Sequence, residues 1–123
     1  MENGSAKIYD LEERTIAFSK MVIQFAKIIP RNVITLSLIG QFVRSGTSVG
    51  ANYHEANGAI SRADFRNKIS ICKKEVKEVR YWIELLVEAE SRMATDAERL
   101  IQESQELINI FSKIYASLKE KQP

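Results

Sequence analysis

The side chains that most often do chemistry in enzymes are scarce in this sequence. It has one histidine, His54, which is followed directly by Glu55, and one cysteine, Cys72. A metal site in a helical bundle needs several inward carboxylates and histidines, and direct sequence neighbours do not share a helix face. The sequence also has no phosphate-binding glycine loop and no dinucleotide-binding fingerprint. We therefore expect no metal ion, no cofactor and no catalytic residue, and we expect a protein that is not an enzyme.

Cys72 lies among regularly spaced apolar residues, which predicts a small core residue rather than a nucleophile. A single cysteine cannot form an internal disulfide, and this suits a reducing compartment. Residues 1–7 lack the apolar segment of a secretion signal, and no stretch approaches the roughly 18 apolar residues that a membrane span needs. These features predict a cytoplasmic protein with no membrane partner.

Polar residues at helical spacing mark the middle of the chain. Arg44, Ser48 and Asn52 follow one another at intervals of one turn, and Glu55 lies on roughly the same face. One interpretation is a buried polar seam that fixes the register of two helices. The other interpretation is a contact with an anion or a partner molecule. The residue types favour the seam and leave the contact open.

A second charged feature is a basic stripe, whose members lie within about 60° of one another on a helix of 100° per residue. They are Arg62, Arg66, Lys73, Lys77 and Arg80. Its two lysines, Lys73 and Lys77, are like charges one turn apart, which costs about 0.2–0.5 kcal/mol in an isolated helix. The stripe could be a solvated surface, or it could face the phosphates of a nucleic acid. It could also face carboxylates of another helix or subunit, such as Glu12, Glu13, Glu103 or Glu106.

Long helices are needed to position these side chains, and the apolar periodicity predicts four of them. Residues 65–86 repeat apolar side chains at steps of 4 and 3 with charged residues between them. This pattern is typical of an amphipathic helix whose narrow apolar seam packs against other helices. Together with similar patterns elsewhere, it predicts an all-α, antiparallel up-down-up-down four-helix bundle formed by one domain, residues 1–123. The predicted helices are residues 9–29, 32–57, 62–90 and 96–119.

The second predicted helix contains an unfavourable stretch, Ser45–Gly50, in which each glycine costs about 0.5–1 kcal/mol relative to alanine. We nevertheless predict a continuous helix, because the apolar period continues through it and small residues let a neighbouring helix come close. Helix starts are indicated by residues that cap the first turn. They are Asp10, Asn32, Ser61 and the capping box Thr95–Glu98.

Composition places the chain among ordinary globular proteins, with 45% apolar and 28% charged residues. The formal net charge of +2 is small for a dedicated nucleic-acid-binding protein, and it leaves that function open. Tyr81, Trp82 and Leu85 lie beside the main apolar seam, and four helices are expected to leave them partly uncovered. Because exposed apolar patches usually mark interfaces, these three residues predict a homo-oligomer interface.

Two segments of the sequence resemble a known family. They are FVRSGTSVGANYHEANGA (residues 42–59) and ADFRNKISICKKEVKEVRYWIELL (residues 63–86). The most specific matches are the stretches 44–53, 55–56, 63–65 and 80–86, and Asp10-Leu11-Glu12 also fits. On these residues the chain resembles, over nearly its whole length, the four-helix-bundle proteins of 23S rRNA intervening sequences, or S23 family. Many members have Glu-Gly at the end of the second helix, where this chain has Glu55-Ala56.

The resemblance implies a bundle that assembles into a ring, with a pentamer as the expected size, in proteins encoded by bacterial genomes. A related branch, the accessory protein of diversity-generating retroelements, is similar in fold and uses a basic pentameric surface to bind nucleic acid and a reverse transcriptase. The resemblance implies no enzymatic activity. We therefore expect a non-enzymatic ring with weak affinity for RNA or DNA. A structural module for a protein partner, such as a reverse transcriptase, and an RNA-processing nuclease are the alternatives.

Overall fold

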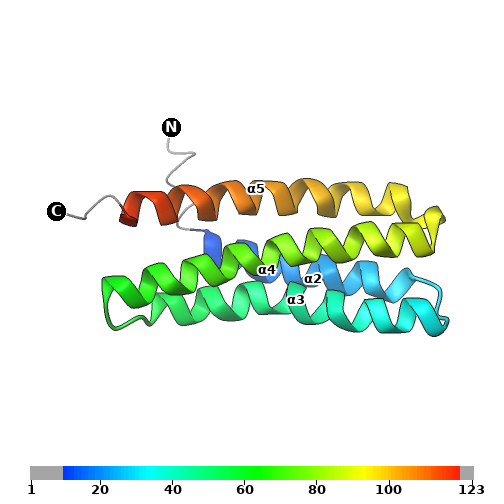
Figure 1. The fold of residues 1–123 in the computed structure, drawn as a ribbon, viewed down its shortest axis with the longest axis horizontal. Helices are drawn as coiled ribbons and strands as arrows, with labels where there is room; N and C mark the ends of the chain where they lie inside the picture. The colour runs from blue at the N-terminus through cyan, green and yellow to red at the C-terminus, as the bar shows by residue number, and fades with distance from the viewer. Residues whose placement is uncertain (1–9, 120–123) are drawn as a thin grey trace.

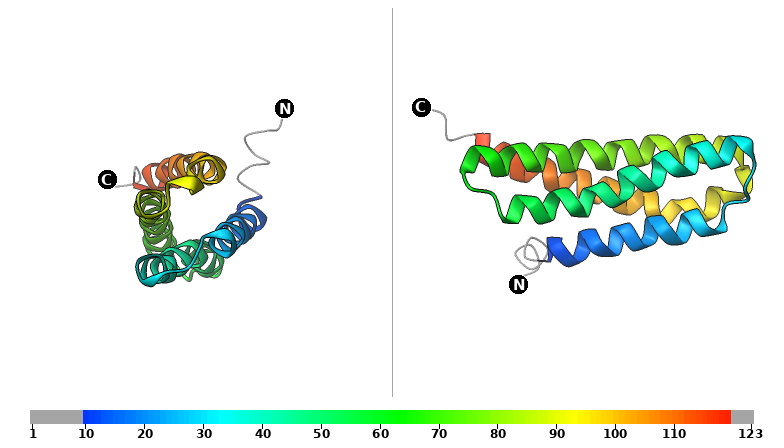
Figure 2. Two further views of the ribbon diagram at one scale, coloured as in Figure 1. Left: turned by 90° about the vertical axis from the view of Figure 1, so that its right-hand side faces the viewer. Right: turned by 90° about the horizontal axis from the view of Figure 1, so that it is seen from below.

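The computed structural model describes residues 10–119, which form four long α-helices lying side by side (Figure 1). Successive helices run in opposite directions, and the order of the helices around the bundle follows the chain (Figure 2). The helices are α2 (Leu11–Ile28), α3 (Val33–Asn57), α4 (Arg62–Ala89) and α5 (Ala94–Lys119), with a short 3-10 turn, η1 (Ser91–Met93), before α5. The predicted all-α, antiparallel four-helix bundle is confirmed.

The predicted helix boundaries agree with the observed ones to about two residues, and residue 9 lies outside the described residues. The prediction that a capping box at Thr95–Glu98 starts the last helix is wrong, because α5 begins at Ala94 and Thr95 is already helical. The 3-10 turn explains the earlier start, since it buries Met93 and leads directly into α5.

The other predicted caps give mixed results. The Asn32 side chain accepts hydrogen bonds from the backbone N–H groups of Ile34 and Thr35, both at 2.9 Å. Ser61 Oγ accepts from the backbone N–H of Asp64 at 3.0 Å. Asp10 makes no side-chain cap, so α2 begins without one. Two of the three single-residue caps are therefore confirmed.

The core lies along the bundle axis, where each helix contributes one apolar stripe. The periodic residues of 65–86 are fully buried except Phe65, which is half-buried at the end of the bundle. Cys72 is fully buried among them, with its Sγ 3.6 Å from the Val49 carbonyl oxygen. Burial raises the pKa of the Cys72 thiol to about 12. The cysteine therefore fills the core as a neutral, unreactive thiol.

The glycine-containing stretch of α3 is helical, as predicted, and it brings α3 close to α2. A Cβ atom placed on Gly46 would lie 2.6 Å from both Cγ atoms of Val22. Gly50 packs less tightly, because its Cβ would lie 3.5 Å from the Thr15 carbonyl oxygen. The poor intrinsic helix propensity of the stretch is thus offset by close packing of two helices.

An ionic cluster joins α2 to α5. Arg14 donates two hydrogen bonds to Glu103, at 2.8 and 3.0 Å, and one to Glu106 at 2.6 Å. The Arg14 side chain is only 16% exposed, and the two carboxylates raise its pKa.

Further along α2 and α5, a groove of about 620 Å³ lies between the two helices and is lined by residues that include Met21, Phe25 and Leu100. Within residues 10–119, no helix is long and apolar enough to cross a lipid bilayer.

Candidate nucleic-acid and assembly surfaces

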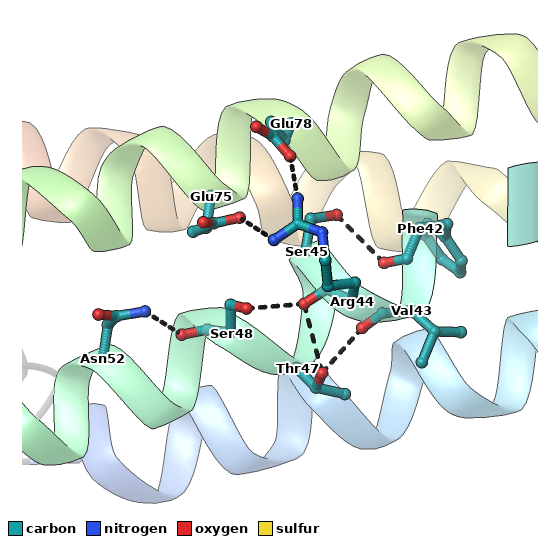
Figure 3. A network of polar contacts seen from close by, with 9 residues as sticks. All are labelled: Phe42, Val43, Arg44, Ser45, Thr47, Ser48, Asn52, Glu75 and Glu78. Carbon is teal, nitrogen blue, oxygen red and sulfur yellow. Dashed lines mark hydrogen bonds and ion pairs between the residues drawn. The ribbon is translucent and has the colours of Figure 1, made fainter. Parts of the chain in front are cut away.

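Arg44 reaches from α3 to two carboxylates of α4, as Figure 3 shows. Its Nη2 atom lies 2.6 Å from Glu78 Oε1, and its Nη1 atom lies 3.7 Å from Glu75 Oε1. The Glu75 side chain is only 8% exposed, whereas the Arg44 side chain is 51% exposed. Arg44 thus neutralises a buried carboxylate from the surface and ties the register of α3 to that of α4.

The rest of the predicted polar seam follows the same side of α3. Ser48 Oγ donates to the Arg44 carbonyl at 2.8 Å, and Asn52 Nδ2 donates to the Ser48 carbonyl at 2.9 Å (Figure 3). Glu55 forms an ion pair of 2.8 Å with Lys68 of α4, which lowers the pKa of the Glu55 carboxyl. The seam is half-exposed, so the prediction that it is buried is wrong. Its hydrogen bonds and ion pairs nevertheless connect α3 and α4 at both ends.

The predicted basic stripe does not form one row of free cations. Arg66 donates a hydrogen bond to the Tyr115 hydroxyl at 3.0 Å, and its guanidinium carbon lies 4.6 Å from the centre of the Tyr115 ring. Arg80 donates a hydrogen bond to Gln105. Because both partners belong to α5, these two arginines reach across the α4–α5 seam, with Arg66 half-buried and Arg80 at the exposed edge of the seam.

Lys73 and Lys77 remain on the outside of α4, and Lys74, which the sequence analysis missed, joins them. We call these three residues the α4 lysine cluster. They line a shallow groove of about 400 Å³ together with Ser70, Glu78 and Tyr81. Within residues 10–119, none of the three lysines forms an ion pair or a side-chain hydrogen bond, and the same holds for the exposed Arg62.

Three of the four carboxylates that could have compensated the stripe within the chain contact other residues, whereas Glu13 is exposed on α2. Glu103 and Glu106 bind Arg14, as described above. Glu12 lies 3.3 Å from His54 Nδ1 and accepts a hydrogen bond from Asn57 at 3.3 Å. The charge of the α4 lysine cluster is therefore left for solvent or for another molecule.

The three residues predicted to form an oligomer interface differ in exposure. Tyr81 is 55% exposed, whereas Trp82 and Leu85 are half-buried. The Tyr81 ring meets the Trp82 ring edge to face, with 4.8 Å between the ring centres. Trp82 Nε1 and Glu75 Oε1 are both buried, and neither has a hydrogen-bond partner within residues 10–119. Tyr81 thus belongs to the lysine groove, and the interface stays a prediction.

A second apolar surface was missed in the sequence analysis. Ile16, Ile23 and Leu36 are 49%, 42% and 56% exposed, and we call them the α2–α3 outer face. Ile16 lies in a groove beside Ala51 and His54 of α3. Ile23 is two turns from Ile16, and Leu36 is on the same side of α3 as Ala51 by helical spacing. The signal was present in the spacing of Ile16 and Ile23, which are seven residues apart and outside the main seam of α2.

Comparison with known proteins places this architecture in a family. Residues 8–113 match the family model of the 23S rRNA-intervening sequence protein. The chain belongs to this family. A crystal structure of a protein of unknown function from the S23 ribosomal protein family of Bacteroides thetaiotaomicron VPI-5482 is similar, with a TM-score of 0.76 and 33% identity. The match covers 85% of this chain and 96% of that chain. No curated protein matches the sequence.

For this 23S rRNA-intervening sequence protein, the predicted family and fold are confirmed, whereas the relation to the retroelement accessory protein stays a prediction. Among residues 10–119 there is no group of three or more His, Cys, Asp or Glu side chains that could hold a metal ion.

Proposed function

We propose that this 23S rRNA-intervening sequence protein is a non-enzymatic, cytoplasmic homo-oligomeric ring, with a pentamer as the expected size, that binds RNA or DNA weakly and without sequence preference. The observation that carries the proposal is the α4 lysine cluster. Its three cations gather in one shallow groove and have no ion-pair partner within residues 10–119. Closely spaced lysines without carboxylate partners attract the phosphates of a nucleic acid backbone.

Assembly of several copies would raise the affinity for nucleic acid above that of one chain. One chain has a formal charge of only +2, whereas five copies would have +10, that is, five times two. A ring would also repeat the α4 lysine cluster around its axis, so a long nucleic acid could contact several copies at once. Each additional contact is then intramolecular, and weak single contacts add to a measurable affinity.

Two different surfaces support self-association, and a closed ring requires two, because each copy contacts its neighbours head to tail. The α2–α3 outer face exposes three large apolar side chains. The other surface contains Trp82 and Leu85 of α4, which are half-buried and lie beside the exposed Tyr81. A neighbouring copy that covers the half-exposed side chains of Trp82 and Leu85 would bury further apolar area.

A salt titration of RNA and DNA binding tests the electrostatic part of the proposal. The affinity should fall steeply with salt, with a log–log slope near 0.9 per phosphate contact for a duplex. Lys73→Glu with Lys77→Glu should abolish binding while the oligomer survives. Lys27→Glu with Lys113→Glu is the matched control, because it makes the same charge change at exposed positions of α2 and α5. Absence of binding by the unmodified protein at low salt would refute the nucleic-acid function.

Light scattering at micromolar concentration tests the ring. We expect a mass several times that of one chain. Ile23→Glu should lower this mass, because it would bury a charge in the interface between two copies. A monomer mass for the unmodified protein would refute the ring. If instead Lys73→Glu with Lys77→Glu yields monomers, the lysines form an assembly seam with carboxylates of the next copy.

The non-enzymatic part is tested by incubating the protein and RNA with Mg²⁺ or Mn²⁺. We expect the RNA to stay intact. Cleavage that Glu55→Ala abolishes would instead identify a nuclease. A pull-down that recovers one stoichiometric protein and no nucleic acid would favour a module that binds a protein partner.

A further inference from the structure

Tyr81 is an aromatic residue in an unusual position for a soluble bundle. It is 55% exposed in the C-terminal half of α4, and its hydroxyl makes no hydrogen bond within residues 10–119. It lies in the same shallow groove as the α4 lysine cluster. Lys77 precedes it by one turn and Lys74 by two, so the aromatic ring continues the row of cations along the outside of the helix.

The ring is held in place from behind. Trp82 meets Tyr81 edge to face, with 4.8 Å between the ring centres and an interplanar angle of 73°. Trp82 is itself half-buried and packs against the core. An aromatic ring that is already ordered loses little conformational entropy when a second flat group stacks on it. Tyr81 thus has the properties of a stacking platform.

We propose that Tyr81 and the α4 lysine cluster form a binding site for single-stranded nucleic acid, in which a base stacks on Tyr81 and the lysines contact the flanking phosphates. This inference rests on the proposed function and adds the class of ligand to it. Lysines alone do not distinguish single strands from duplexes, because both present phosphates. Stacking on an exposed ring does distinguish them, because the bases of a duplex already stack on one another, whereas those of a single strand are free.

The site also contains its own reporter. Trp82 is the only tryptophan in the sequence, and it touches the residue on which the base would stack. A base on Tyr81 should therefore quench the intrinsic fluorescence of the protein. Phosphate contact at the lysines without stacking should leave the emission of Trp82 nearly unchanged.

The test measures the affinity of the full chain for an unstructured oligouridylate, an oligothymidylate and an RNA duplex of equal length at low salt. We expect tighter binding of both single strands, with quenching of Trp82. Tyr81→Ala should weaken single-strand binding about 5- to 100-fold and leave duplex binding unchanged. Tyr81→Phe keeps the ring and should bind within about twofold of the unmodified protein. Lys74→Gln should weaken single-strand and duplex binding alike and lower the salt slope by about one.

The outcomes separate this inference from the proposed function. If Lys74→Gln weakens binding but Tyr81→Ala does not, and single strands and duplexes bind equally, the proposed function stands and the stacking site is refuted. If the unmodified protein binds none of the three probes, both are refuted. If Tyr81→Ala lowers the mass of the assembly without changing the affinity of each site for the single strands, Tyr81 belongs to an interface between subunits and the stacking site is refuted. Circular dichroism of each variant shows that the helices are intact.

Discussion

The close approach of α2 and α3 at Gly46 leads to a sharp prediction about stability. A Cβ atom on Gly46 would lie 2.6 Å from both Cγ atoms of Val22 and 3.0 Å from its Cβ. Valine in a helix has one strongly preferred rotamer, so the Val22 side chain cannot rotate away cheaply. Gly46→Ala must therefore move the two helices apart or strain them, and overpacking of this kind costs about 1–3 kcal/mol.

Gly40 provides a matched control in the same helix. A Cβ placed on Gly40 has no other atom within 4 Å, so Gly40→Ala changes only the backbone propensity. This change should stabilise the fold by about 1 kcal/mol, and Gly46→Ala gains the same amount before the clash is counted. The gain in helix propensity is the same for both alanine variants. Their free energies of unfolding should therefore differ by the overpacking cost alone, which we set at about 2 kcal/mol.

Urea unfolding of both variants at one protein concentration, followed by circular dichroism, measures this difference. A double-mutant cycle with Val22→Ala then identifies its cause, because removal of the two Val22 Cγ atoms should relieve most of the overpacking and leave only the contact of 3.0 Å with the remaining Cβ. If Gly46→Ala stabilises the protein as much as Gly40→Ala does in the presence of Val22, the close approach of the helices is refuted.

Two further predictions concern buried groups. Arg14→Gln should lower the free energy of unfolding by about 1–3 kcal/mol in urea, because Glu103 loses a charged hydrogen-bond donor. The stabilisation that Arg14 provides should not change around neutral pH, because the pKa of Arg14 is raised and the guanidinium loses its charge only in strong alkali. An unchanged unfolding midpoint would contradict it. Cys72 should resist maleimide in the native protein and react with it in urea. Because folding raises the pKa of the thiol from 9.0 to about 12, the unfolded chain loses this proton first, and the free energy of unfolding should fall as pH rises from 9 to 12. Rapid labelling of the native protein would contradict this prediction.

The fold could be predicted because each helix repeats one physical pattern. The apolar period of residues 65–86 requires partner helices, and it does so whatever residues occupy the polar positions between. The period also predicted a helix through Ser45–Gly50 against local propensity, since tertiary packing outweighs about 1 kcal/mol per glycine. Capping was less predictable, because the start of α5 depends on how η1 buries Met93, which is a tertiary contact.

The candidate site was less predictable for a reason that concerns side-chain reach. Helical angles placed Arg66 and Arg80 in the same stripe as Lys73 and Lys77, and the structure agrees about the angles. The angles do not show which neighbouring side chain lies within reach. Tyr115 and Gln105 of α5 accept hydrogen bonds from the two arginines, whereas the lysines have no hydrogen-bond partner on another helix within residues 10–119.

This division follows from the chemistry of the side chains as well as from their positions. A guanidinium group is planar and weakly hydrated, so it stacks on a ring such as that of Tyr115 and accepts partial burial. An ammonium group is compact and strongly hydrated, and it stays in water on its flexible stem unless an anion replaces that water. The same stripe therefore separates into two arginines that contact α5, Arg66 and Arg80, and a group that remains available, which contains the lysines and Arg62. Lys74, although about 60° from Lys77 on the helix, joins the available group because its stem is long enough to reach the groove. An anion that enters this groove meets three hydrated cations and no competing carboxylate except Glu78, which Arg44 already neutralises.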